Sequence, residues 1–167
     1  KGDVVIEGDR IVFAGKHGGP GREGRSHMQD TEIDVSGLAV APGFINMLSW
    51  ANESLLHDGR SQSDIRQGVT LEVLGEGTSM GPWNTAMKKE ELEQQADIKY
   101  PIEWTTLGEY LDYLVARGIS CNVASFVGAT TARIHELGFA DRPPKPEELE
   151  RMCGLVRQAL REGAVGV

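Results

Sequence analysis

Apolar positions follow two different rhythms along this chain. Four short runs rich in β-branched residues come first, and Gly8-Asp9 separates the first two at the spacing of a hairpin turn. This part of the sequence therefore predicts antiparallel strands, interrupted by a glycine-rich loop between the second run and the third. The four runs are residues 3–7, 10–14, 31–35 and 38–41.

Beyond Pro42, strand-like runs alternate with stripes of helical period. This alternation predicts βαβ units with parallel strands. We therefore divide the chain into residues 1–41 and residues 42–167. The predicted strands of the second part are residues 44–45, 69–74, 119–127 and the start of one at 164–167, and its predicted helices are residues 107–117 and 146–162.

End signals accompany both predicted helices. Thr106 and Glu109 have the spacing of a capping box, and Gly118 follows as a natural stop. Pro146 suits the first turn of the second helix, and Gly163 ends it. These signals fix the helix limits better than the apolar stripes alone.

Composition and charge exclude several classes of protein. The chain has 167 residues, 40% of them hydrophobic, and a formal net charge of −8, which argues against nucleic acid and anionic membranes as partners. No apolar run approaches the roughly 18 residues of a membrane span. Cys121 and Cys153 lie in a strand-like and a helical pattern, so we expect buried, reduced thiols. A cytoplasmic location is the expectation that fits them.

A resemblance to a known family becomes visible at the start of the second part. Residues 42–46 read Pro-Gly-Phe-Ile-Asn, and matching segments follow in order at 67–70, 141–143 and 162–166. The layout resembles the amidohydrolase superfamily, and specifically the N-acyl-D-amino-acid deacylases (D-aminoacylases). The resemblance implies an α/β fold in which residues 1–41 belong to a small β-sandwich domain. It also implies that residues 42–167 are the first βα units of a (β/α)₈ TIM barrel, with residues missing before Lys1 and more than half the barrel missing after Val167.

The sequence departs from that family where metal ligands are expected. The first barrel strand of the family ends in His-x-His, but Leu48 and Trp50 occupy these positions here, and neither can ligate a metal. A second landmark, Gly-Asn-Cys-Gly, is replaced by a turn in which Glu76 lies at or next to the place of the metal-binding cysteine. We expect Glu76 to bind a single zinc ion, or else to serve as a turn carboxylate that accepts hydrogen bonds from nearby amides.

Other polar residues at the predicted barrel mouth are candidates for substrate contacts. Ser49 and Glu53 are expected either to bind substrate or to cap the following helix. Residues 61–64 read as a structural helix N-cap. Arg133 matches an arginine of the family and is expected either to orient a carboxylate or to form an ion pair that holds a helix. The histidines show no metal-ligand spacing and are expected at the surface; they are His17, His27, His57 and His135.

Two functions remain open on this basis. The first is a metal-dependent hydrolase that deacylates N-acyl-D-amino acids, a small-molecule substrate class. The resemblance places its general base and remaining histidine ligands beyond Val167, so this chain alone is expected to be inactive. The second is a metal-free homologue that acts as a binding or assembly subunit. In either case the remaining polypeptide or another chain is expected to complete the barrel and cover its open edge.

Overall fold

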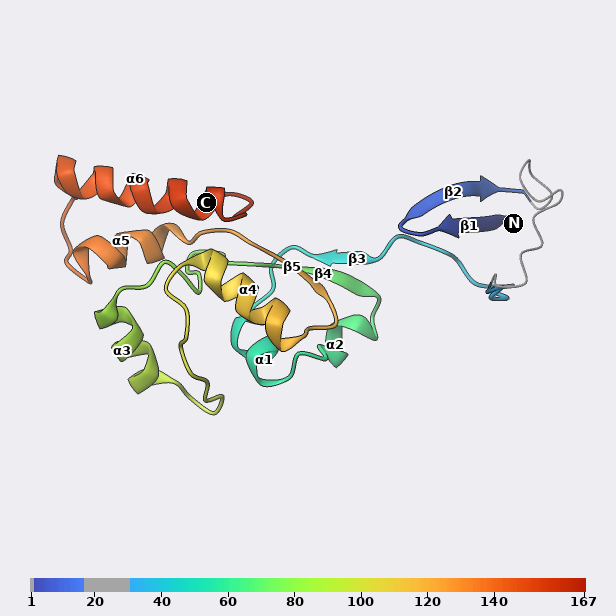
Figure 1. Cartoon of the computed structure of the whole chain (residues 1–167), viewed down its shortest axis with the longest axis horizontal. Helices are drawn as coiled ribbons and strands as arrows, with labels where there is room; N and C mark the ends of the chain where they lie inside the picture. The colour runs from blue at the N-terminus through green and yellow to red at the C-terminus, as the bar shows by residue number, and fades with distance from the viewer. Residues whose placement is uncertain (1, 17–30) are drawn as a thin grey trace. The chain divides into compact units, whose positions relative to one another are not determined.

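A computed structural model describes residues 2–16 and 31–167 (Figure 1). The chain divides into two compact units, Lys1–Pro42 and Gly43–Val167. The predicted glycine-rich loop falls mostly outside the described residues, and so do His17 and His27.

The first unit contains the predicted hairpin. Strands β1 (Asp3–Glu7) and β2 (Arg10–Gly15) pair antiparallel, and the turn between them places Gly8 at φ 62°. The prediction of two strands at residues 31–35 and 38–41 is wrong. Residues 31–41 form an irregular segment with one turn, closed by the Leu38 amide donating to the Val35 carbonyl at 2.9 Å. A β-rich sequence becomes a strand only when a partner strand lies beside it, and the described residues offer none here.

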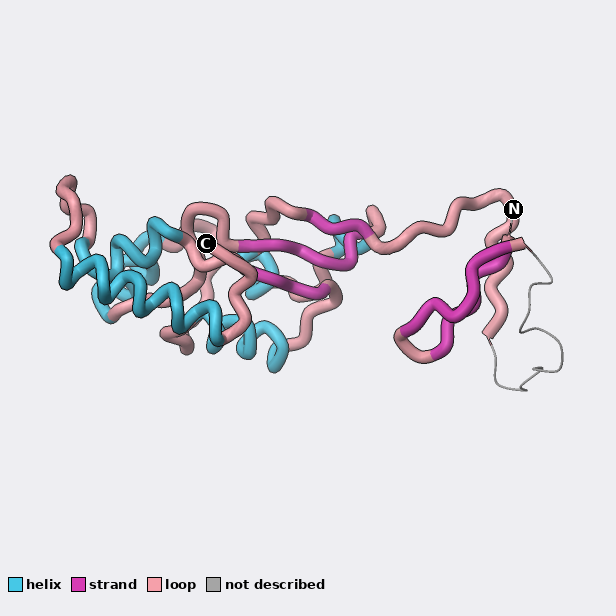
Figure 2. Tube along the Cα trace, turned by 90° about the horizontal axis from the view of Figure 1, so that it is seen from above, coloured by secondary structure: helices cyan, strands magenta, loops and turns pink. Residues whose placement is uncertain are grey.

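The second unit contains a parallel sheet whose strands lie in chain order. Its strands are β3 (Phe44–Asn46), β4 (Val69–Leu74) and β5 (Asn122–Ser125), in the order β3-β4-β5 (Figure 2). The end of the chain continues this order, because the Val165 amide donates to the Ser125 carbonyl and the Val127 amide donates to the Gly166 carbonyl. The predicted run at 164–167 thus lies along β5. The mixed α/β class is confirmed.

Helices fill every connection between these strands. Helices α1 (Asn52–His57) and α2 (Gln62–Ile65) lie between β3 and β4, and α3 (Thr85–Gln94) and α4 (Leu107–Arg117) lie between β4 and β5 (Figure 1). Helices α5 (Ala129–Leu137) and α6 (Pro146–Arg161) follow β5. Among residues 2–16 and 31–167, no helix combines the length and the apolar character needed to span a bilayer.

The two helices with end signals are confirmed. Helix α4 has the full capping box of Thr106 and Glu109, and Gly118 follows it at φ 86°. Helix α6 carries Pro146 in its first turn and ends one residue before its predicted limit. Capping groups satisfy the free amides of a helix start locally, so they can be found without tertiary information.

An aromatic cluster forms the centre of the second unit. The Trp104 side chain is 1% exposed, and its ring lies 5.2 Å from the ring centres of both Tyr110 and Tyr113. Its indole Nε1 donates to the Met80 carbonyl at 2.6 Å. The Tyr110 hydroxyl donates to the Asn52 carbonyl at 3.0 Å, which fastens α4 to the start of α1. This cluster fixes the connections that follow β3 and β4.

Candidate functional site

The turns that follow β4 and β5 meet at the carboxyl edge of the sheet. Gly75 and Gly77 flank Glu76 with φ values of 90° and 71°, so the sharp turn expected around Glu76 is present. A side chain at Gly75 would collide with the Phe126 carbonyl oxygen, and a Cβ at Gly128 would lie 2.6 Å from the Gly77 carbonyl oxygen. Close backbone contact therefore fixes both turns against each other.

Glu76 is exposed on this turn. Its backbone carbonyl accepts from the Thr78 amide at 2.7 Å, which tightens the turn. No group of three or more histidine, cysteine, aspartate or glutamate residues that could hold a metal occurs within residues 2–16 and 31–167. The residues described here therefore do not form a metal site by themselves. Whether Glu76 is a ligand stays a prediction.

A cavity of about 290 Å³ adjoins the same region, and it brings Glu53 together with residues that the sequence did not suggest. Trp50 and Glu53 line one side, and helix α3 supplies Glu90 and Glu91. The remaining lining residues come mainly from the turn after β4 and from α5. They are Asn52, Thr78, Ser79, Met80, Trp83, Met87, Gln94, Thr131, Ile134 and Phe139.

Ser49 lies away from this cavity, on the buried side of the sheet. It is 7% exposed, and its hydroxyl donates to the Glu72 carboxylate at 2.6 Å. Its neighbours Leu48 and Trp50 are 53% and 73% exposed, as expected when successive side chains of an extended segment point to opposite faces. The structure thus separates Ser49 from Glu53. A substrate contact by Ser49 stays a prediction.

Glu72 is a fully buried carboxylate that the sequence analysis did not single out. Besides the Ser49 hydroxyl, it accepts hydrogen bonds from the Ser61 hydroxyl at 2.6 Å and from the Cys121 thiol at 3.1 Å. Ser61 precedes α2 as predicted, yet its hydroxyl makes no capping bond because it is directed to Glu72. Ser61 also adopts a left-handed conformation with φ 41°, which typically costs a non-glycine residue about 1–3 kcal/mol. The hydrogen bond to Glu72 is the contact that offsets this strain.

Both cysteines are free thiols, and the burial predicted for both is present at Cys121 but not at Cys153. Burial raises the pKa of Cys121 to about 11, and the hydrogen bond to Glu72 acts in the same direction. The thiol is therefore protonated at neutral pH, as a hydrogen-bond donor to a carboxylate must be. Cys153 is only partly buried.

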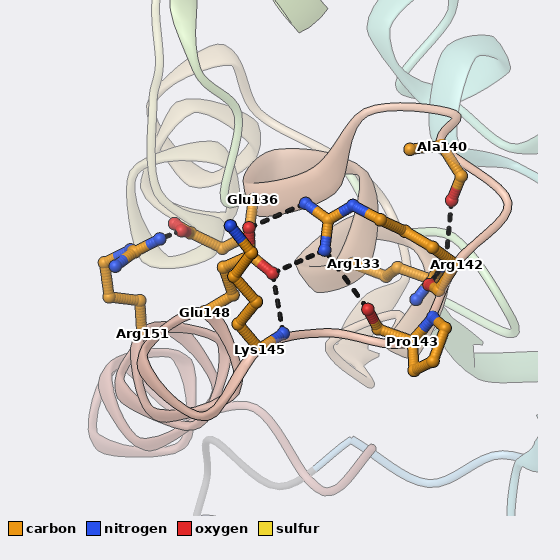
Figure 3. Close-up of polar contacts among 8 residues, drawn as sticks. All are labelled: Arg133, Glu136, Ala140, Arg142, Pro143, Lys145, Glu148 and Arg151. Carbon is orange, nitrogen blue, oxygen red and sulfur yellow. Dashed lines mark hydrogen bonds and ion pairs between the residues drawn. The ribbon is translucent and has the colours of Figure 1, made fainter.

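Arg133 serves the connection between α5 and α6. Its guanidinium donates to the carbonyls of Ala140 and Arg142 at 2.9 and 2.8 Å (Figure 3). These two bonds to carbonyls, rather than an ion pair, tie Arg133 to the connection after α5. Arg133 therefore closes the connection that carries Phe139, a residue of the cavity wall. A contact between Arg133 and a carboxylate stays a prediction.

We expect Arg133→Met to lower the free energy of unfolding by about 1–2 kcal/mol, because two exposed carbonyls lose a charged donor. Hydrogen exchange at residues 138–145 should become faster, whereas exchange in α4 should not change. Arg157→Met is the matched control, since Arg157 pairs with the exposed Glu150 on α6. Unchanged exchange at 138–145 would contradict this role.

Ion pairs continue from this connection onto α6. The Arg142 guanidinium donates two hydrogen bonds of 2.7 Å to Glu148, and Arg151 donates to Glu136 at 2.6 Å (Figure 3). The Arg142 guanidinium, followed by the Lys145 amide, lowers the pKa of Glu148 from 4.5 to about 2. Glu136 lies beside His135 as well, at 3.1 Å from its Nδ1. Together these contacts join α5 to α6.

The depressed pKa of Glu148 predicts an acid-sensitive contribution to stability. A carboxylate whose folded pKa is lowered contributes fully above its unfolded pKa, so this contribution should be present above pH 4.5 and lost as the pH falls toward about 2. Glu148→Gln should flatten this part of the stability curve, measured by denaturant unfolding at a series of pH values. Glu150→Gln on the same helix is the control. An unchanged acid slope in Glu148→Gln would refute the assignment.

Comparisons with known proteins agree with the resemblance drawn from the sequence. The chain is 32% identical over 168 residues to a D-aminoacylase from Alcaligenes xylosoxydans xylosoxydans, covering 100% of this chain and 33% of that protein. It is 31% identical over 172 residues to an N-acyl-D-aspartate deacylase from the same organism, covering 100% of this chain and 32% of that protein. No protein-family model matches the chain.

Solved structures give the same result. A D-aminoacylase described as having a binuclear metal center superposes with a TM-score of 0.76 at 28% identity, over 98% of this chain and 33% of that one. An N-acyl-D-glutamate deacylase from Bordetella bronchiseptica, solved with zinc and a phosphonate inhibitor, shares the fold with a TM-score of 0.61 at 24% identity, over 75% of this chain and 26% of that one. The chain thus spans about a third of the length of the relatives it matches. Its similarity to the D-aminoacylases, expected from the sequence, is confirmed.

Proposed function

We propose that this chain is part of a metal-dependent amidohydrolase that removes the acyl group from N-acyl-D-amino acids. The observation that carries the proposal is similarity along the whole chain to D-aminoacylase, in sequence at 32% identity and in structure at a TM-score of 0.76. Fold alone does not fix a substrate. The chain is about equally similar to a D-aminoacylase and to an N-acyl-D-aspartate deacylase. This similarity therefore supports the deacylation reaction more strongly than it supports any one amino-acid substrate.

The strand order supports a barrel as the scaffold. In doubly wound sheets the order reverses at a switch point, whereas in a (β/α)₈ barrel each parallel strand lies next to the one before it. Strands β3, β4 and β5 follow each other without reversal, and residues 165–166 come next. We infer that residues 42–167 form the first βα units of a TIM barrel and that residues 1–41 belong to a small β-sandwich domain. The other strands would come from polypeptide outside this chain.

The catalytic groups would be shared between this chain and that additional polypeptide. We place Glu76 as one ligand of a single zinc ion, since it stands on the turn after β4 at the carboxyl edge, where active sites of barrels lie. The other ligands and the general base would lie outside the chain. Glu53 lines the cavity and is the substrate contact that we favour. Ser49 would support the site indirectly, because its hydrogen bond to Glu72 holds the segment that follows β3.

Metal content and stereospecific hydrolysis of the purified full-length protein, which contains the additional polypeptide, test the proposal. We expect about one equivalent of zinc, hydrolysis of N-acetyl-D-amino acids but not of their L-isomers, and loss of both zinc and activity in Glu76→Ala. Glu93→Ala, an exposed carboxylate of α3 outside the cavity, is the control. Zinc retained at wild-type level by Glu76→Ala would exclude Glu76 as a ligand. Absence of D-specific hydrolysis by the wild-type protein would overturn the proposed deacylase activity.

One feature favours a second candidate, a metal-free homologue that acts as a binding or assembly subunit. Leu48 and Trp50 occupy the positions where the resemblance places two histidine ligands, and both side chains are more than half exposed at the end of β3. A protein without bound zinc and without hydrolysis, but with a stable association to another chain, would support this alternative.

A further inference from the structure

The cavity beside the carboxyl edge combines an apolar wall and neutral polar residues with charges of one sign. Its apolar wall includes the indole rings of Trp50 and Trp83 and the Phe139 ring, and its charged residues are Glu53, Glu90 and Glu91. No lysine, arginine or histidine of the described residues lines it. At about 290 Å³ it lies near the lower end of the sizes of small-molecule pockets, so it suits a group no larger than an amino-acid side chain.

The two lysines on helix α3 do not neutralise these carboxylates. The Lys88 ammonium donates to the Thr105 hydroxyl at 2.8 Å, and Lys89 pairs with Glu93 at 3.8 Å. The negative field reaches neighbouring groups. Burial raises the pKa of Tyr100, and its hydrogen bond to Glu91 and the charges of Glu91 and Glu53 act in the same direction. The two α3 carboxylates accept hydrogen bonds from neutral donors, from the Tyr100 hydroxyl at 2.7 Å and from the Gln94 amide at 3.0 Å. The cavity therefore combines aromatic surface with negative charge that no cation of its lining balances.

The Trp50 and Trp83 rings differ in their freedom to contact a ligand. Trp83 is 6% exposed and is fixed by its indole Nε1, which donates to the Ser79 carbonyl at 3.1 Å. Trp50 is 73% exposed in this chain, so the described residues leave much of its indole surface uncovered. An indole face attracts a cation more strongly than any other side-chain ring, and the attraction grows as the cation loses water. A neutral group could gain at most a hydrogen bond from the carboxylates, and an anionic group would be repelled by them.

We propose that this cavity binds an organic cation, an ammonium or guanidinium group carried on an apolar stem. The stem packs against the aromatic wall, and the charged end faces Glu53 and the two carboxylates of α3. The inference rests on the proposed function only for its second step, in which this cation is the side chain of the N-acyl-D-amino acid. That step predicts a substrate of opposite charge to the side chain named for the aspartate deacylase relative.

Titration calorimetry of the purified protein with three probes of similar shape tests the first step. Benzylammonium should bind saturably, and benzyl alcohol and benzoate should bind at least about tenfold more weakly, since they lack the cation–carboxylate and cation–π attraction. Glu53→Gln and Glu90→Gln should each weaken benzylammonium binding by about threefold to tenfold. Glu93→Gln removes the same charge from α3 outside the cavity and should leave binding unchanged. Equal affinity for the alcohol, no saturable binding, or equal weakening by Glu93→Gln would overturn the proposal.

Hydrolysis tests the second step separately. The kcat/KM for N-acetyl-D-lysine should exceed that for the neutral, similarly long N-acetyl-D-norleucine, and Glu53→Gln should remove this preference. Equal values in the wild-type protein would overturn the assignment of the cation to the substrate. If neither compound is hydrolysed while benzylammonium still binds, the proposed hydrolase fails and the cation site stands.

Discussion

Replacing Glu72 with alanine is expected to lower the free energy of unfolding by about 3 kcal/mol, because two buried donors, Ser49 and Cys121, and the partly buried Ser61 hydroxyl lose their common acceptor. Each unsatisfied buried donor costs about 1–3 kcal/mol. The three losses do not add up, since the three donors share the Glu72 carboxylate as one hydrogen-bond network. The Ser61 hydroxyl would also lose the contact that offsets its left-handed backbone. Denaturant unfolding monitored by tryptophan fluorescence measures the change.

Two further variants distinguish this network from simple loss of volume. Glu72→Gln keeps the shape of the side chain and one acceptor oxygen, so we expect it to cost about 1 kcal/mol. Glu93→Ala removes an exposed carboxylate and should change stability by less than about 0.5 kcal/mol. A cost of Glu72→Ala no larger than that of Glu93→Ala would contradict a structural role for the buried carboxylate.

Replacing Trp104 with alanine is expected to have the largest effect on stability, about 3–5 kcal/mol. Removal of a fully buried indole leaves a cavity and removes the contacts that several neighbouring rings make with it. The Trp104 ring stacks on Tyr100 at 6.2 Å and contacts Tyr110 and Tyr113 at 5.2 Å. Near-ultraviolet circular dichroism reports the loss of this packing, and denaturant unfolding reports its free energy.

Trp104→Phe separates the ring from its hydrogen bond. Phenylalanine fills most of the volume but leaves the Met80 carbonyl without the indole donor, so we expect a cost of about 1–3 kcal/mol. Trp50→Ala is the matched control, because that indole is 73% exposed and should contribute less than about 0.5 kcal/mol. If Trp104→Phe proved as destabilising as Trp104→Ala, the hydrogen bond rather than the ring packing would dominate.

Local signals in the sequence predicted the parts of the fold that depend on local contacts. The hairpin around Gly8, the capping box of Thr106 and the proline start of α6 each involve residues within a few positions of one another. Helix α3 was not predicted, because its sequence carries no apolar stripe that would mark a buried face. The strands expected at 31–41 do not form although their β-rich pattern is clear. Such a pattern becomes a strand only beside a partner strand, and a local sequence does not specify that partner.

The same distinction applies to the site. Glu53 and the glycine turn around Glu76 could be predicted, because they follow predicted strands and therefore lie at the same edge of the sheet. Glu72 was overlooked inside an apolar run, although a glutamate in a buried strand requires hydrogen-bond partners. Those partners could not be named, since Cys121 reaches Glu72 through the pairing of β4 with β5, and Ser61 reaches it through the contact of α2 with β4.

The contact between the turns after β4 and β5 limits how this region can diverge among homologues. Because neither Gly75 nor Gly128 can accept a side chain, substitutions there would be selected against, and insertions would separate two backbones that touch. New ligand preferences would therefore have to evolve in the connections on either side, through α3 and through residues 138–145 with Phe139. In this protein, the most constrained loops and the most adaptable ones border the same cavity.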